Sequence, residues 1–344
     1  MGDHRTDLLR LSHVWANIFT SVLHWAAVND ISVFGPMNNA NPEFERLVST
    51  IKYLFEESME PHLLDDRLDQ QWQTETVSHQ SYRAVLCSQN NKPIGLLEHW
   101  TTESGDTRLE LLLHKDLTQP LHPAPVFDEA VSITETLISK LSETAPLNHE
   151  GNGPTVELWS RPTSTPVERV IENLKSQLTR HLFQMRCETE ISTLDFVDQS
   201  VPFTPDDRET LIEINNLAFA DHPDQGNMTV ERFERIASEP WFEPDGIRLW
   251  KVEDRIAAFC WTKIHDKPPL GEIYVIGVDP TFQGRGIGTL VTTSGIHWLA
   301  HKQQRAVMLY VEADNIAAVK VYERLGFKTV RVDKAWQLSL QKKD

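Results

Sequence analysis

The stretch with the clearest chemical signal is VDPTFQGRGIGTL, residues 278–290. Gly284, Gly286 and Gly288 alternate there, Arg285 lies among them, and a segment with helical periodicity follows. Backbone N–H groups at a helix N-terminus attract anions, because these donors lack partners and the positive end of the helix dipole points outward. Glycine also lets a phosphate oxygen approach the main chain without meeting a Cβ atom. The loop therefore predicts a cradle for a phosphate or pyrophosphate group.

Three alternatives apply to this loop. A Walker A loop would end in Gly-Lys-Ser/Thr, which is absent here. A dinucleotide-binding loop would have the spacing GxGxxG, whereas this loop has GxGxG and comes late in its α/β unit. A glycine-rich turn without a ligand is the third alternative, although clustered glycines lower helix stability and so need another reason to be there.

The elements that would position the loop follow a regular pattern in the second half of the chain. Asp314 is the expected N-cap of a late helix, and Gly326 is its expected C′ residue. Strands are expected at 246–252, 255–265, 272–278, 307–311, 327–332 and 335–340, helices at 286–301 and 315–325, and a proline-containing loop at 265–271.

The first half repeats this order with a period of roughly 160 residues. Strands are expected at 82–87, 93–100, 109–114 and 155–159, followed by a helix at 167–182. The segment LTQPLHPAPVFDEAVS, at the place of the glycine loop, has three prolines and no glycine. We therefore expect two α/β domains, residues 1–190 and 191–344, of which only the second has the phosphate cradle.

Composition excludes several classes of function. The chain has 344 residues and a net charge of −17, which argues against binding to nucleic acid or to an anionic membrane, since like charges repel. Its three cysteines form no paired motif, and no apolar run reaches the ~18 residues that span a bilayer. We expect a cytoplasmic monomer that uses no metal, because no clustered Cys/His spacing occurs.

Two motifs carry a family resemblance. The pattern V-x-P-x-x-Q-x-x-G-x-G at 278–288 resembles the acyl-CoA loop of GCN5-related N-acetyltransferases, and NIAAVKVYERLGF at 315–327 is similar to their second signature. The resemblance implies an α/β fold of two tandem GCN5-related N-acetyltransferase (acyl-CoA N-acyltransferase) domains, each a mixed central sheet with flanking helices. It also implies that acetyl-CoA lies between two splayed parallel strands, here EIYVIGV and VMLYV.

A closer resemblance covers roughly residues 208–338. The segments NNLAFADHPDQGNMT, WFEPDGIRL, FCWTKIH and LYVEADN are similar to the mycothiol synthase family. That resemblance implies acetyl transfer from acetyl-CoA to the cysteinyl amine of cysteinyl-glucosaminyl-inositol, the last step of mycothiol biosynthesis. Two alternatives remain: an N-acetyltransferase for another small-molecule or peptide amine, and an acyl-CoA sensor without catalysis.

The resemblance assigns roles that the residues alone leave open. Glu272 matches the general base, although by itself it fits a solvated glutamate at a strand end. Tyr322 matches the general acid, although its spacing from Asn315 fits a core tyrosine equally well. The acetyl-CoA contacts match Ile276, Gly277, Val278, Gln283, Gly284, Arg285, Gly286, Ile287, Gly288, Thr289, Asn315, Ile316, Ala317, Ala318, Val319 and Lys320.

The acceptor contacts implied by the resemblance are Asp224, Lys263, Tyr310 and the shared Glu272. Asp224 stands where the family usually has glutamate, so its reach is one methylene shorter. A further acidic contact from the family's N-terminal domain has no clear counterpart here. The first domain is therefore expected to have a structural and acceptor-binding role, without acyl-CoA.

Overall fold

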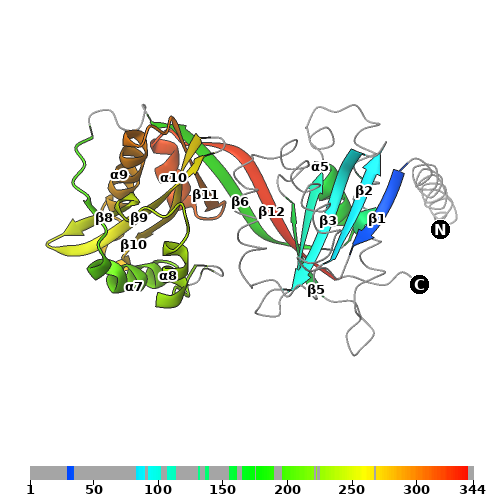
Figure 1. Cartoon of the computed structure of the whole chain (residues 1–344), viewed down its shortest axis with the longest axis horizontal. Coiled ribbons are helices and arrows are strands. Elements are labelled where there is room, and N and C mark those ends of the chain that lie inside the picture. Colours follow the sequence, from blue (N-terminus) through cyan, green and yellow to red (C-terminus); the bar gives the residue numbers. More distant parts are fainter. Residues whose placement is uncertain are drawn as a thin grey trace, which may run out of the picture. The chain divides into compact units, whose positions relative to one another are not determined.

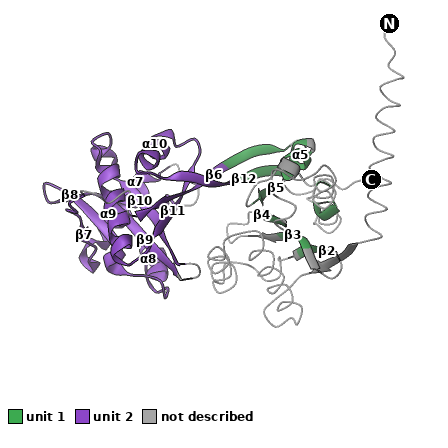
Figure 2. Ribbon diagram, turned by 90° about the horizontal axis from the view of Figure 1, so that it is seen from above, with its two compact units in different colours: residues 1–180, 333–344 green, residues 181–332 purple. Residues whose placement is uncertain are grey.

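The chain forms two compact units in the computed structural model: residues 1–180 with 333–344, and residues 181–332 (Figure 2). The structure describes residues 29–34, 83–89, 92–101, 107–113, 131, 136–138, 155–160, 165–174, 176–189, 196–220, 222, 225–266 and 269–339. Within this part, no helix is long and apolar enough to span a lipid bilayer.

The second unit contains a mixed sheet with the strand order β6-β11-β10-β9-β8-β7. Strand β10 is antiparallel to β9 and parallel to β11, so the expected parallel pair is present. The strands are β6 (Gln177–Glu188), β7 (Val201–Pro202), β8 (Ile247–Val252), β9 (Arg255–Asp266), β10 (Pro269–Val278) and β11 (Ala306–Glu312).

Helices cover both faces of this sheet (Figure 1). Helices α9 (Ile287–His301) and α10 (Ile316–Arg324) lie on one face, and α7 (Arg208–Ala218) and α8 (Val230–Ala237) lie on the other. Short 3₁₀ helices η3 (Pro205–Asp207), η4 (Pro244–Gly246) and η5 (Pro280–Phe282) connect these elements.

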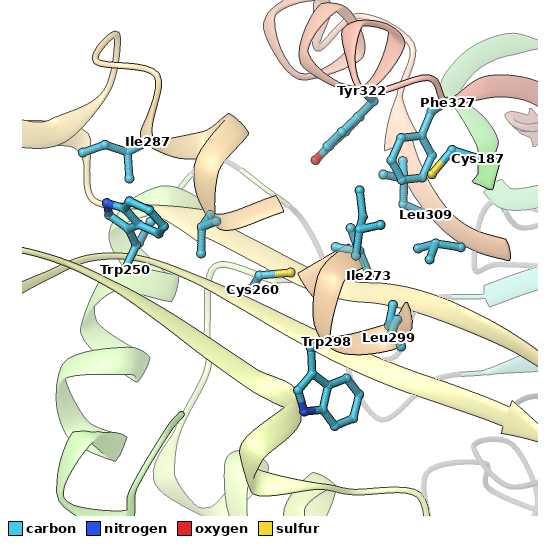
Figure 3. Close-up of a cluster of buried hydrophobic side chains, with 14 of the residues drawn as sticks. Cys187, Trp250, Cys260, Ile273, Ile287, Trp298, Leu299, Leu309, Tyr322 and Phe327 are labelled. Carbon is cyan, nitrogen blue, oxygen red and sulfur yellow. The ribbon is translucent and has the colours of Figure 1, made fainter. Parts of the chain in front are cut away.

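The face under α9 and α10 holds the larger core of the second unit (Figure 3). Trp298 and Leu299 of α9 pack there with Cys260 of β9 and Ile273 of β10. A Cβ atom at Gly295 would lie 2.4 Å from the Cys260 sulfur, so only glycine lets α9 approach β9 this closely. The glycine loop begins α9, so this packing fixes the loop against the sheet.

The first unit has the strand order β1-β2-β3-β4-β5-β12. Strand β4 runs parallel to β5, as β10 does to β11, which confirms the internal repeat. Its elements are β1 (Asn29–Phe34), β2 (Arg83–Gln89), β3 (Lys92–Thr101), β4 (Thr107–Leu113), β5 (Thr155–Ser160), α5 (Thr165–Asn173) and β12 (Lys328–Ser339).

The final strand of each repeat belongs partly to the other unit (Figure 2). β6 follows α5 in the first repeat, yet Leu182–Glu188 pair with β11. β12 follows α10 in the second repeat, yet Lys334–Ser339 pair with β5. Division into two contiguous segments at residue 190 therefore differs from the observed units, because the last residues of the chain complete the sheet of the first unit.

Several local expectations are wrong in detail. The helix expected at 167–182 ends at Asn173, and β6 begins at Gln177. The two strands expected at 327–332 and 335–340 form one strand, β12. The expected loop at 265–271 is shorter, because β9 extends to Asp266 and β10 begins at Pro269.

Asp198 holds residues 196–200 against helix α9 and strand β8. Its carboxylate accepts hydrogen bonds from the Ser200 N–H (2.9 Å) and the Ser294 hydroxyl (2.8 Å), and it lies 3.7 Å from an Arg248 nitrogen. Burial by itself would raise the pKa of this carboxyl, but the hydrogen bonds from Ser200 and Ser294 and the charge of Arg248 outweigh burial and lower the pKa.

We therefore expect Asp198→Asn to lower Tm by about 3–6 °C near neutral pH, since hydrogen bonds to a charged group are lost. A carboxyl with a lowered pKa stabilises the fold above its ordinary pKa of 3.8, and this stabilisation is lost as the pH falls below that value. When Tm is measured as a function of pH, the curves of wild type and of Asp198→Asn should converge at acid pH. Asp206→Asn, at an exposed neighbour, is the control; a pH-independent difference for Asp198→Asn would contradict the assignment.

Candidate active site

The ladder between β10 and β11 is short. It pairs Gly271, Glu272 and Ile273 with Val307, Met308 and Leu309, although β10 continues to Val278 and β11 to Glu312. The β10–β9 register shifts between Ile273 and Val275, which marks a β-bulge at the same level. A bulge bends its strand away from the regular ladder. The two parallel strands therefore part directly after Glu272 and Ile273.

Strand register brings three of the four expected acceptor contacts to one face of the sheet. Glu272 pairs with Lys263 on β9 and with Met308 on β11, and residues paired across a ladder share a face. Tyr310 is two residues beyond Met308, so it shares that face as well. Lys263, Glu272 and Tyr310 thus lie on the face opposite the core under α9 and α10.

Glu272 makes a close, buried contact with His265. Its Oε2 lies 2.7 Å from Nε2 of His265, and the side chains are 9% and 5% exposed respectively. His265 is two residues from Lys263 on β9, so the same alternation brings it to the face of Glu272. The sequence motifs gave His265 no role; the hairpin register between β9 and β10 is the signal that pairs it with Glu272.

Lys263 is buried beside two aromatic rings. Its Nζ lies 4.6 Å from the centroid of the Trp241 ring and 5.8 Å from that of Tyr274. Both distances fit cation–π contacts. Lys263 is therefore held in a defined position against the aromatic wall formed by Trp241 and Tyr274.

Tyr310 lies in a polar group that the sequence did not indicate. Its hydroxyl accepts hydrogen bonds from Gln184 Nε2 (2.9 Å) on β6 and from Arg331 Nη2 (2.8 Å) on β12. Burial lowers the pKa of the Arg186 guanidinium. Tyr310 acts in the opposite direction and raises this pKa, whereas the charge of Arg331 lowers it further. Gln184 and Arg186 share the face of Tyr310 and Met308, their partners in the β6–β11 ladder.

The glycine loop is exposed and has the backbone that an anion cradle needs. Gly284 (φ 74°) and Gly286 (φ 79°) adopt left-handed conformations, and a Cβ atom on either would meet nothing within 4 Å. Gly286 is the N-cap of α9. Within the described part of the chain, the N–H groups of Gly286, Ile287 and Gly288 have no protein acceptor. They can therefore donate to a ligand's phosphate oxygens.

Two arginines flank this loop. The guanidinium carbons of Arg285 and Arg255 each lie 5.3 Å from the centroid of the Phe282 ring. Arg285 was expected from the motif, but Arg255 was missed, because it comes from the start of β9 and only the tertiary fold brings it to the loop. An Arg255 nitrogen lies 3.9 Å from the Asp279 carboxylate, which partly balances its charge.

The helix that carries the second signature begins beside the parted strands. Asn315 caps α10, since its side chain accepts the Ala318 N–H at 3.1 Å. The expected N-cap Asp314 is therefore wrong by one residue. Asn315, Ile316, Ala317 and Lys320 are exposed, whereas Ala318 and Val319 are partly buried. Most of this expected acetyl-CoA contact surface is thus open to solvent.

Comparison with known proteins agrees with this geometry. The model of the acetyltransferase (GNAT) family matches residues 211–327. The mycothiol acetyltransferase of Mycobacterium avium is 43% identical over 210 residues, which covers 54% of this chain and 64% of that protein. The mycothiol acetyltransferase of Rhodococcus erythropolis is 35% identical over 200 residues, covering 54% of this chain and 67% of that protein.

This chain belongs to the mycothiol acetyltransferase family. It covers less than two thirds of the length of several of these relatives, for example 61% of the Streptomyces griseus protein, to which it is 39% identical. The similarity covers 53–54% of this chain in these three comparisons.

Solved structures show that the fold extends beyond that region. A GCN5-related N-acetyltransferase from Sphaerobacter thermophilus has a TM-score of 0.58 at 18% identity, covering 91% of this chain and 96% of its own. A tandem GNAT protein from the clavulanic acid biosynthesis pathway has a TM-score of 0.55 at 13% identity, and the match covers 92% of this chain and 100% of that one. The fold of this family member is therefore a tandem GNAT fold, as expected.

Tyr322, the acid implied by the family motif, lies on the other face of the sheet. It packs with Phe327 (ring centroids 5.8 Å apart) in the core cluster that includes Ile273, and its hydroxyl points away from Phe327 (Figure 3). Burial raises the pKa of Tyr322, and Cys260 adds to the shift. The phenol therefore keeps its proton at neutral pH, as a general acid must.

Asp224, the expected acidic acceptor contact, lies outside the described residues. Within the described residues, no group of His, Cys, Asp and Glu is arranged to hold a metal ion.

Proposed function

We propose that this protein transfers the acetyl group of acetyl-CoA to the cysteinyl amine of cysteinyl-glucosaminyl-inositol. The observation that carries the proposal is that β10 and β11 separate just after Glu272 and Ile273. Among the described residues, the loop that follows β10 has backbone N–H groups without protein acceptors, and Arg285 lies beside them. Family membership supports the choice of acceptor, since curated relatives are mycothiol acetyltransferases.

The residues present fit acetyl-CoA. The N–H groups of Gly286, Ile287 and Gly288 would bind its pyrophosphate, with Arg285 adding positive charge. The β10 edge from Ile276 to Val278 would hold the pantetheine arm by strand-like hydrogen bonds, because the β11 ladder ends before it. The bound group supplies an acetyl thioester, which is an electrophile for an amine.

Glu272 and Tyr322 would then divide the proton transfers. An acceptor ammonium cannot attack until it loses a proton, and the Glu272 carboxylate is placed to receive it, directly or through one water. Tyr322 keeps the proton of its hydroxyl at neutral pH, since burial raises its pKa, and it would give this proton to the departing thiolate. The two side chains approach from opposite faces, which suits a reaction at the gap between the parted strands.

Lys263 and Tyr310 would bind the acceptor. Both lie on the Glu272 face of the sheet, and both are held by neighbours, Lys263 by Trp241 and Tyr310 by Gln184 and Arg331. An ammonium group and a phenol can donate hydrogen bonds to the hydroxyls of a sugar and an inositol.

The proposal is tested by incubating the purified protein with acetyl-CoA and cysteinyl-glucosaminyl-inositol, and following the product by mass spectrometry. We expect a product with one added acetyl group, formed at least about 100-fold faster than from cysteine alone, because the sugar and inositol contribute binding energy. Equal rates with cysteine, or transfer only to a peptide amine, would indicate another acceptor. Acetyl-CoA binding without transfer to any of these amines would indicate a non-catalytic acyl-CoA binder.

A further inference from the structure

We propose that His265 is a positioning residue for the proton transfer at Glu272: it holds carboxylate oxygen Oε2, so that Oε1 is the atom that receives the proton of the acceptor amine. This inference rests on the proposed function and concerns a residue to which neither the sequence motifs nor the family assignment gave a role.

The contact between the two residues is close and protected from water. Nε2 of His265 and Oε2 of Glu272 are 2.7 Å apart, and both side chains are at least nine-tenths buried. They come from adjacent antiparallel strands whose register is regular from Pro269 to Ile273. A buried carboxylate needs such a partner, because an unpaired charge away from water is costly. The hairpin between β9 and β10 thus supplies a fixed partner for Glu272.

The second oxygen of the same carboxylate is available for chemistry. Among the described residues, no donor forms a hydrogen bond with Glu272 Oε1. The Glu272 side chain keeps 9% of its surface exposed, and Oε1 is not fully buried without a partner. The carboxylate therefore has one oxygen tied to His265 and one open to an incoming amine or a bridging water.

The neighbour opposite Glu272 does not duplicate this role. Lys263 pairs with Glu272 in the ladder, but its Nζ lies over the Trp241 ring. Among the described residues, His265 is thus the hydrogen-bond partner of the carboxylate, and its side chain has fewer rotatable bonds than that of Lys263. A base held in one orientation keeps the amine within transfer distance, and displacement of about 1 Å can slow a reaction roughly 100-fold.

The proton balance follows from this arrangement. When the carboxylate is ionised, Nε2 of His265 must carry the proton of the 2.7 Å hydrogen bond, because both carboxylate oxygens are acceptors. The acceptor ammonium then gives one proton to Oε1 and becomes the amine nucleophile, while His265 keeps its own proton. The Glu272 proton returns to solvent after the product leaves.

Two substitutions separate positioning from simple packing. His265→Leu removes the donor but keeps an apolar side chain, and we expect kcat to fall at least about tenfold with the Kd of acetyl-CoA unchanged. His265→Gln places an amide N–H at a reach similar to that of Nε2, and we expect it to recover kcat to within about threefold of wild type. His301→Gln, at an exposed position on α9, is the control.

Packing alone predicts a different result. The apolar leucine should then be tolerated at least as well as glutamine in a buried position, and losses in kcat should follow losses in Tm. Wild-type kcat in His265→Leu, or His265→Gln no faster than His265→Leu at equal Tm, would overturn the proposal.

An NMR measurement that does not depend on turnover distinguishes failure of the positioning role from failure of the proposed function. In protein labelled with ¹⁵N-histidine, a slowly exchanging Nε2 proton should be visible by NMR, absent from His265→Gln and shifted in Glu272→Ala. If that signal is present but wild type acetylates no amine, the proposed function fails and with it the catalytic role. If wild type is active but the signal does not respond to Glu272→Ala, the positioning role is wrong and the function stands.

Discussion

Glu272→Gln is expected to lower kcat for acetyl transfer at least about 100-fold, the lower end of what a general base contributes. Glutamine has the same shape as glutamate and keeps an oxygen that can accept from His265, so the buried contact and the fold should survive. It has no basicity, so the acceptor ammonium would have no residue to receive its proton. The loss should therefore be in kcat, with the Kd of acetyl-CoA within about threefold of wild type.

The measurement is steady-state turnover by mass spectrometry, together with calorimetric titration of acetyl-CoA. Glu213→Gln, an exposed glutamate on α7, is the matched control and should leave both quantities unchanged. A Glu272→Gln variant that turns over at the wild-type rate would remove Glu272 as the base. Parallel loss of acetyl-CoA affinity would instead indicate that Glu272 supports the cofactor site.

Gly286→Ala is expected to raise the Kd of acetyl-CoA at least about tenfold. Gly286 has φ 79°, in the left-handed region, where a side chain costs roughly 1–2 kcal/mol per residue. The added Cβ would meet no protein atom within 4 Å, so the strain, and not a clash, would move the loop. Because the N–H groups of Gly286, Ile287 and Gly288 are the proposed pyrophosphate donors, a change in their direction would weaken binding.

Gly326→Ala is the matched control for this variant. Gly326 follows α10 with φ 89°, so alanine there carries comparable backbone strain away from the loop. Both variants should lower Tm by a similar few degrees. Only Gly286→Ala should lose acetyl-CoA affinity in calorimetric titration; equal affinity in the two variants would show that the loop amides do not bind the cofactor.

The elements around the loop were predictable because their signals are local. Alternation of apolar residues predicts β8 and β9, and prolines and glycines limit the segments between strands. The helix expected at 167–182 failed for a physical reason: Gln177 to Leu182 lie in β6, where pairing with neighbouring strands overrides local propensity.

The site could be predicted only in part. The motif located Gly286 and Tyr322. Which residues of FCWTKIH and EIYVIGV share a face depends on strand register, and the sequence does not specify register. The bulge after Ile273 shifts the alternation of β10, so that Glu272 and Val275, three residues apart, share a face. The sequence EIYVIGV contains no residue pattern that predicts this bulge.

The sequence by itself determined that the chain contains a repeated α/β unit, that only the second copy has a glycine loop before a helix, and that the loop suits a phosphate. These follow from local composition and spacing. Tertiary structure alone decided that His265 contacts Glu272, that Arg255 reaches the loop, and that β12 completes the sheet of the first unit. The reason is that strand register and sheet membership are set by pairing between segments distant in the chain, and local propensity carries no information about them.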